Sequence, residues 1–178
     1  MARPFVVSLG ALRRAGGRHE EIRRGPIAGL RVGDSSVPAG EDVVVDVVLE
    51  LVPGGVVASG TVTAPFVSEC RRCLRPLRGT VSAEVREVYQ SDVAPDAAEE
   101  IYPLSGDQLD LEPLARDAVL LELPLAPLCA EGCLGLCPTC GANLNEGDCA
   151  CSGTDTDPRW AGLDALRSTP TNTPSNDS

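Results

Sequence analysis

Eight cysteines in a chain of 178 residues constrain this sequence more than any other feature, because their spacing limits the chemistry that can join them. Two pairs have a two-residue gap, and we call Cys70-Arg-Arg-Cys73 the first knuckle and Cys137-Pro-Thr-Cys140 the second knuckle. This gap lets both sulfurs converge on one ion, and zinc takes four such ligands in a tetrahedron. The sequence therefore predicts two closed zinc sites, with two zinc ions held by Cys70, Cys73, Cys129, Cys133, Cys137, Cys140, Cys149 and Cys151.

The eight ligands can be divided between the two ions in two ways. In the first, the last four cysteines close a local site within residues 137–151, and Gly147 allows the chain to turn back. The first knuckle then pairs with Cys129 and Cys133. In the second, the two knuckles share one ion and the other four cysteines bind the second ion. We favour the first division because local closure costs less chain entropy.

Disulfides are the first alternative to metal, and they require an oxidising compartment. Residues 1–12 have only a short apolar run, which Arg13 and Arg14 interrupt, so they do not resemble a signal peptide. No segment approaches the ~18 apolar residues of a membrane span. We therefore expect a cytoplasmic protein with no membrane association, in which the cysteines are metal ligands.

Redox chemistry and iron–sulfur clusters are further alternatives. Arg71 and Arg72 would lower the pKa of a thiol in the first knuckle, as in a reactive Cys-x-x-Cys site. Thioredoxin-like sites open a helix, however, and Pro76 disfavours a helix directly after Cys73. Four cysteines also suit an iron–sulfur cluster, but the paired knuckle spacing is more typical of zinc.

The pattern of aliphatic residues predicts a β-rich antiparallel sheet or partial barrel. A Pro53-Gly54-Gly55 turn separates two Val-rich runs and indicates a hairpin. The expected strands are residues 42–52, 56–67 and 80–89, with an earlier strand within 20–32 that is interrupted near Gly25.

One main helix is predicted at residues 110–123, where apolar residues recur at helical spacing between a capping Asp110 and Pro124. The expected fold class is α+β, with this one main helix and a C-terminal cysteine-rich zinc module. The expected domains are a β-rich domain at 1–128, the zinc module at 129–151 packed on it, a short terminal helix at 157–167 whose Trp160, Leu163 and Leu166 pack on the domain, and a disordered tail at 168–178.

The net charge of −11 is unevenly placed, because the acids concentrate in the second half of the chain and the arginines in the first. Any nucleic-acid contact must therefore lie on the first half, and the acidic half suits solubility or a basic partner. We expect one RNA-facing patch from two groups of arginines, or else a solvated face on which these arginines pair with Glu20, Glu21, Glu69 and Glu84. The nucleic-acid-binding candidates are Arg13, Arg14, Arg71, Arg72, Arg75 and Arg78. The N-terminal group of arginines, to which Arg13 and Arg14 belong, also contains Arg18, Arg23, Arg24 and Arg31.

A catalytic site is not expected. His19 is the sole histidine and is predicted to be a solvated surface residue, and there is no Gly-rich phosphate loop or nucleophile with a partner base. The sequence thus favours a protein that is not an enzyme and has no small-molecule substrate.

Several of these motifs together resemble the YceD family. They are the run from Pro127 to Asn145 followed by Cys149-Ala-Cys151, the first knuckle with Leu74-Arg75-Pro76, the helix before Pro124, and Asp157-Pro158-Arg159-Trp160. The resemblance implies a non-catalytic role in ribosome biogenesis, in the synthesis, processing or stability of large-subunit (23S) ribosomal RNA. It also implies ribosomal RNA or a pre-ribosomal particle as partner, reached directly or through a basic ribosomal protein. The alternatives are a protein-interaction adaptor with structural zinc and a thiol-redox or chaperone-like protein.

Overall fold

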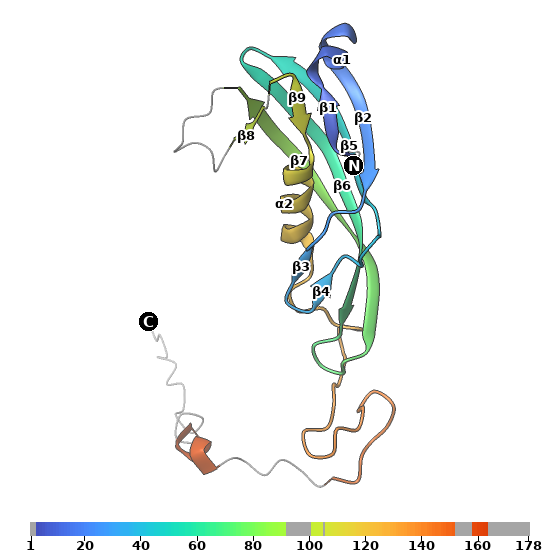
Figure 1. Cartoon of the computed structure of the whole chain (residues 1–178). Helices are drawn as coiled ribbons and strands as arrows, with labels where there is room; N and C mark the ends of the chain where they lie inside the picture. The colour runs from blue at the N-terminus through green and yellow to red at the C-terminus, as the bar shows by residue number, and fades with distance from the viewer. Residues whose placement is uncertain (1–2, 92–100, 105, 152–157, 164–178) are drawn as a thin grey trace, which may run out of the picture. The chain divides into compact units, whose positions relative to one another are not determined.

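The computed structural model describes residues 3–91, 101–104, 106–151 and 158–163. The chain forms two compact units, Met1–Gly135 and Leu136–Ser178, and each is described by itself (Figure 1). The sequence placed the zinc module at 129–151, whereas the division between units falls after Gly135. The reason is that Cys129 and Cys133 lie against the first knuckle, so they belong to the first unit.

The first unit is built on an open antiparallel sheet, as predicted, and no closed barrel forms. Four strands make its body: β2 (Arg18–Gly25), β5 (Val43–Val52), β6 (Gly55–Glu69) and β7 (Pro76–Gln90). Each pairs with the next in this order, and β6 and β7 pair in register from Gly55↔Gln90 to Glu69↔Pro76. The predicted strands are confirmed, although β6 and β7 are longer than expected.

Small strands complete the two sheets. β3 (Arg31–Val32) and β4 (Ser35–Ser36) extend the sheet near the end of β6, and β8 (Tyr102–Pro103) pairs in parallel with the end of β7. A separate two-stranded sheet joins β1 (Val6–Ser8) to β9 (Gln108–Asp110). β3 falls within the strand region expected at 20–32, whereas β1, β4, β8 and β9 were not predicted, because two or three residues carry no readable periodicity.

Residue alternation explains why one face of the sheet is buried. In β5 the residues Val43, Val45, Val47 and Leu49 are buried, and the residues between them face the other side. The β5–β6 hairpin turns at Pro53-Gly54, where Gly54 has φ +85°, a value that glycine adopts easily. The Pro-Gly turn therefore fixes the register of the hairpin.

Helix α2 (Glu112–Glu122) lies across the buried face of the sheet (Figure 1). It buries Leu114, Ala115, Ala118 and Val119 in the common core. The expected helix at 110–123 is confirmed to within two residues, and the Asp110 side chain accepts a hydrogen bond from the Glu112 N–H (3.0 Å).

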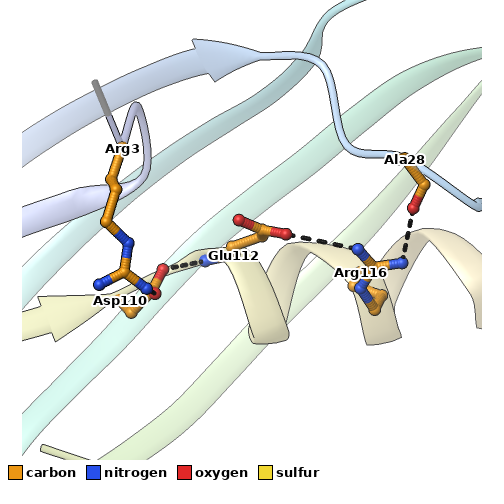
Figure 2. A network of polar contacts seen from close by, with 5 residues as sticks. All are labelled: Arg3, Ala28, Asp110, Glu112 and Arg116. Carbon is orange, nitrogen blue, oxygen red and sulfur yellow. Dashed lines mark hydrogen bonds and ion pairs between the residues drawn. The ribbon is translucent and has the colours of Figure 1, made fainter. Parts of the chain in front are cut away.

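Polar contacts tie the helix to two distant segments (Figure 2). Arg3 pairs with Asp110 (2.8 Å), just before the helix begins. Arg116 pairs with Glu112 (3.3 Å) and donates to the carbonyl oxygen of Ala28 (2.8 Å). These contacts hold the N-terminal segment and the β2–β3 connection against α2.

The remaining helices are short. α1 (Leu9–Arg14) follows β1 and buries Leu9 and Leu12. In the second unit a 3₁₀ helix, η1, spans Pro158–Leu163, inside the expected terminal helix. Its Trp160 and Leu163 are exposed, whereas Leu166 and the tail at 168–178 lie outside the described residues. Packing of this stripe on the domain stays a prediction. Within the described residues, every helix is too short or too polar to cross a membrane.

The β5–β6 pairing depends on a glycine at position 60, because a Cβ there would lie 2.2 Å from the Asp46 carbonyl oxygen. We expect Gly60→Ala to lower the free energy of unfolding by about 1–3 kcal/mol, since backbone atoms must move. Urea unfolding followed by circular dichroism measures this. The matched control is Gly132→Ala, whose Cβ meets no atom within 4 Å and should change stability by less than about 0.5 kcal/mol. Equal stability of the two variants would contradict the prediction.

Candidate metal centres

Four cysteine sulfurs converge at one end of the first unit. Cys70 and Cys73 lie in the loop that joins β6 to β7, and Cys129 and Cys133 lie in the segment after α2. The four sulfurs all lie within 4.8 Å of one another, with Cys70 to Cys133 at 3.8 Å and Cys73 to Cys129 at 3.5 Å. A tetrahedral ion with metal–sulfur bonds of ~2.3 Å requires sulfurs ~3.8 Å apart. The cluster therefore has the dimensions of a four-thiolate metal site.

Polar contacts bring the segment after α2 to this loop. Ser35 donates to the carbonyl oxygen of Pro124, and its hydroxyl lies 2.9 Å from that of Ser68 near the end of β6. The Arg71 N–H donates to the carbonyl oxygen of Pro127 (3.0 Å). These contacts align residues 124–133 with the end of the β6–β7 hairpin.

Arg72 binds the same segment. Its guanidinium donates to the carbonyl oxygen of Cys133 (2.8 Å). Gly135 allows a close approach, because a Cβ there would lie 3.2 Å from the Arg72 carbonyl oxygen and the glycine has φ +81°. Arg72 thus supports the cluster, a role that its place in the sequence did not indicate.

A second cluster of four sulfurs lies in the second unit. It contains Cys137, Cys140, Cys149 and Cys151, again within 4.8 Å of one another. The Asn143 side chain accepts hydrogen bonds from the backbone and side chain of Asn145, and its amide donates to Glu146 (2.7 Å). This local turn reverses the chain and returns it to the second knuckle.

The structure groups the cysteines as in the first of the two divisions considered from the sequence. All eight are free thiols. Cys70, Cys73 and Cys133 are buried in the first cluster, whereas Cys137 alone is buried in the second. The second cluster is therefore open to solvent on more of its surface.

The two knuckles share one backbone geometry. The Cys70 N–H donates to the Arg75 carbonyl and the Leu74 N–H to the Cys70 carbonyl. In the second knuckle the same two bonds join Cys137 to Ala142 and Gly141 to Cys137. The residue after each pair has positive φ, at +57° for Leu74 and +74° for Gly141. Both knuckles thus turn identically, and the first continues into strand β7 instead of opening a helix as a thioredoxin-like site does.

This geometry directs backbone amides at the first sulfur of each knuckle. For Cys70, burial opposes ionisation, but amides of Cys73 and Arg72 lower the pKa to about 6. For Cys137, the amides of Cys140 and Thr139 lower the pKa to about 6. Hydrogen bonds with neighbouring thiols, that of Cys73 above all, raise the pKa of Cys129 to about 12. The first cluster therefore holds a sulfur that ionises easily, Cys70, beside one that a cation must help to ionise, Cys129.

The candidate RNA-binding arginines lie near the two ends of strand β6. Arg71, Arg72 and Arg75 are exposed in the loop of the first knuckle, and Arg78 is exposed on β7. Arg13 and Arg14 lie in α1, beside the β5–β6 turn at the opposite end of β6 (Figure 1). β6 has 15 residues and spans ~45 Å at about 3.3 Å per residue. The hairpin therefore separates Arg13 and Arg14 from the first knuckle, whereas Arg31 of the same N-terminal group lies on β3, which joins β4 opposite Val67 near the knuckle. A single RNA-facing patch stays a prediction.

Ion pairs already hold several arginines of the N-terminal group. Arg13 pairs with Asp107 (2.8 Å), Arg18 with Glu50, and Arg23 with Glu21 (2.9 Å). His19 is exposed, with its ring 3.7 Å from Glu21. These contacts support the solvated-face interpretation for this group, although the partners differ in part from those expected.

Comparison with known proteins agrees with these features. The sequence profile described as "Large ribosomal RNA subunit accumulation protein YceD" matches residues 58–167, which include all eight cysteines. The chain belongs to the YceD family. This family is named for an accumulation factor and not for an enzyme.

Relatives extend the match over nearly the whole YceD-family chain. An uncharacterised protein of Mycobacterium tuberculosis is 36% identical over 169 residues, covering 92% of this chain and 81% of that protein. Two chloroplast proteins named as YCED homolog 1 match shorter parts. The Arabidopsis thaliana protein is 35% identical over a match that covers 37% of this chain and 21% of that protein. The Zea mays protein is 41% identical over a match that covers 28% of this chain and 17% of that protein. No solved structure matches the chain.

Metal affinity of this YceD-family protein should depend on pH, because binding releases protons from thiols. Cys70 and Cys137, each with a pKa of about 6, are ionised at neutral pH and protonated below about pH 6. We therefore expect metal affinity to fall as pH is lowered. Below pH 6 one more thiol per site must lose its proton when the metal binds, so the slope of log affinity against pH should be larger by about one. Competition with a chromophoric zinc chelator, corrected for the chelator's own protonation, measures this slope. A constant slope through pH 6 would contradict the prediction.

Proposed function

We propose that this protein is a non-catalytic, zinc-binding factor that supports the accumulation of large-subunit (23S) ribosomal RNA. The observation that carries the proposal is the presence of two four-thiol clusters in a chain that matches the YceD profile over residues 58–167. The chloroplast relatives bear the same description of large ribosomal RNA subunit accumulation. A reducing cytoplasm is the compartment that the proposal requires, because it keeps the thiols available as ligands.

Zinc is the ion that the donor set fits best. Four thiolates in a tetrahedron suit zinc, and sites with four protein ligands leave no position for water or substrate. A structural metal at each cluster therefore supplies folding free energy instead of catalysis. In the first unit the ion would link the β6–β7 loop to the segment after α2, through Cys70 and Cys73 on one side and Cys129 and Cys133 on the other.

Metal content tests this assignment. Protein purified under reducing conditions should contain two zinc ions per chain, one for each cluster. Cys70→Ser/Cys73→Ser and Cys137→Ser/Cys140→Ser should each lose one ion and keep the other, because the two clusters share no ligand. Elemental analysis by mass spectrometry measures the ratio. A chain with no metal, or with one ion and reactive thiols at the other cluster, would rule out two structural sites.

The loop of the first knuckle is the surface that we propose for RNA. Arg71, Arg75 and Arg78 are exposed at this end of the unit, and guanidinium groups match phosphate oxygens in geometry. A metal-bound loop holds such side chains with little loss of entropy on binding. Glu69 precedes Cys70 and Glu131 lies between Cys129 and Cys133, and both are exposed, so the contact must involve the arginine side chains and not a uniformly basic face.

Ribosomal RNA levels test the function in cells. A strain that lacks the gene should have a lower ratio of 23S to 16S ribosomal RNA, and the wild-type gene should restore it. Arg71→Glu/Arg75→Glu should fail to restore the ratio, because charge reversal repels phosphate. The matched control is Arg14→Glu/Arg24→Glu, two exposed arginines away from the loop, which should restore it. The ratio is read from total RNA by electrophoresis.

The two parts of the proposal fail separately. A normal ratio in the strain without the gene would overturn the role in RNA accumulation. Full restoration by Arg71→Glu/Arg75→Glu would overturn the RNA-binding surface and leave that role intact.

A further inference from the structure

A groove lies between strand β7 and helix α2 in the first unit, apart from the metal centres. Its volume of about 170 Å³ is smaller than the ~300–1,000 Å³ of small-molecule pockets, so it suits the side chains of a peptide and not a cofactor. Its walls combine apolar and acidic residues. They are Ala83, Val85, Leu114, Ala118 and Leu121 with Glu84, Glu87, Asp117 and Glu122, beside Tyr102.

The groove borders a free strand edge. β7 pairs with β6 along its whole length on one side, but on its other side the described strands pair with it only at Tyr89 and Gln90, through β8 (Figure 1). The Gln90 carbonyl accepts from Leu104 N–H (2.8 Å) on this edge. The N–H and C=O groups of successive residues in a strand point to opposite edges. Glu84 and Arg86 are an even number of residues from Gln90, so their backbone groups face the same edge as those of Gln90. A row of backbone donors and acceptors therefore faces outward beside the groove, as in sites that bind peptides by strand addition.

The walls of the groove are negatively charged. No arginine lines it, and in the described part of the chain no ion pair involves Glu84, Glu87 or Glu122. At one end the Tyr102 hydroxyl donates to Asp117 (2.8 Å). Burial first, and then Asp117 and Glu87, raise the pKa of Tyr102, as expected in a negative field. This charge favours a cationic partner and repels a phosphate backbone.

An exposed leucine marks the rim of the groove. Leu121 is in the last turn of α2 and is 86% exposed, the most exposed of the large hydrophobic side chains described. Leu125, just after the helix, is also exposed, at 77%. Apolar side chains beside an acidic groove are typical of a surface that binds another protein.

We propose that this groove binds an extended basic segment of a partner protein, which adds as a strand to the free edge of β7. Alternate side chains of the segment would enter the groove, with apolar ones against Val85 and Leu121 and cationic ones near Glu87 and Glu122. The segment is a protein because the acidic walls exclude RNA. This interaction goes beyond the proposed function and depends on neither zinc nor RNA.

A designed octapeptide tests the proposal with the full-length, metal-loaded protein. The fluorescent probe Arg-Thr-Val-Thr-Val-Thr-Arg-Thr places Arg and Val on one face of a strand. It should bind saturably, whereas the same peptide with Glu in place of Arg should not. Glu87→Arg/Glu122→Arg should weaken binding about tenfold, as the loss and reversal of two charge contacts requires. Fluorescence anisotropy measures the affinity, and circular dichroism checks the fold.

Matched variants separate this site from general attraction to an acidic protein. Glu41→Arg/Asp42→Arg changes two exposed acids before β5 and should bind the probe like the wild type. Leu121→Ser should weaken binding, whereas Ile22→Ser, at a residue that is 56% exposed on β2, should not. The proposal is overturned if the probe does not bind, if the acidic peptide binds equally, or if the control variants weaken binding as much as the groove variants.

The mode of binding has its own test. Glu84→Pro removes an edge N–H that does not pair with β6, and proline is tolerated at such positions. It should weaken binding more than Glu84→Ala, which removes only the charge. Equal affinities of these two variants would overturn strand addition. Sedimentation equilibrium without peptide tests whether a second copy of the chain occupies the groove. A dimer that Leu121→Ser dissociates would assign the groove to that second copy and overturn the proposal of a basic partner.

Discussion

The convergence of four thiols at the end of the β6–β7 hairpin is the interaction on which the first unit depends. It joins Cys73 to Cys129, which lie 56 residues apart in the sequence. Apart from the thiols, hydrogen bonds at Pro124, Pro127 and Cys133 hold the segment after the helix to the rest of the unit. A metal ion bound at this cluster would close a long loop, the case in which a crosslink contributes most in chain-entropy terms.

All eight cysteines of this protein belong to the two four-thiol clusters, and this limits the chemistry that the clusters can perform. In each knuckle the same two backbone bonds form a turn that aims amides at the first sulfur, Cys70 or Cys137. Four thiolates around one ion at each cluster would leave no open coordination position. Metal bound at these clusters would hold the chain in shape, and our proposals therefore place function on the surrounding surfaces.

Two surfaces of opposite charge lie on one strand, β7. Its beginning adjoins the first knuckle, where Arg71 and Arg75 are exposed, and its middle forms one wall of the acidic groove with Glu87. Separation along the strand lets each surface keep its own charge, because the Debye length of ~8 Å at physiological ionic strength screens one from the other. A factor with RNA on one surface and a basic protein segment on the other would bring the two together.

The sequence by itself determined the ligand type, the two knuckles and the main strands and helix, because spacing and periodicity are local properties. It also favoured the grouping of Cys70 and Cys73 with Cys129 and Cys133 through an argument about loop entropy. Only the tertiary structure decided that Arg13 and Arg71 lie at opposite ends of a hairpin, that Arg72 binds the Cys133 carbonyl, and that β7 has a free edge beside α2. These features depend on which segments, distant in the sequence, the sheet brings together in space. Local sequence patterns do not encode such spatial relations.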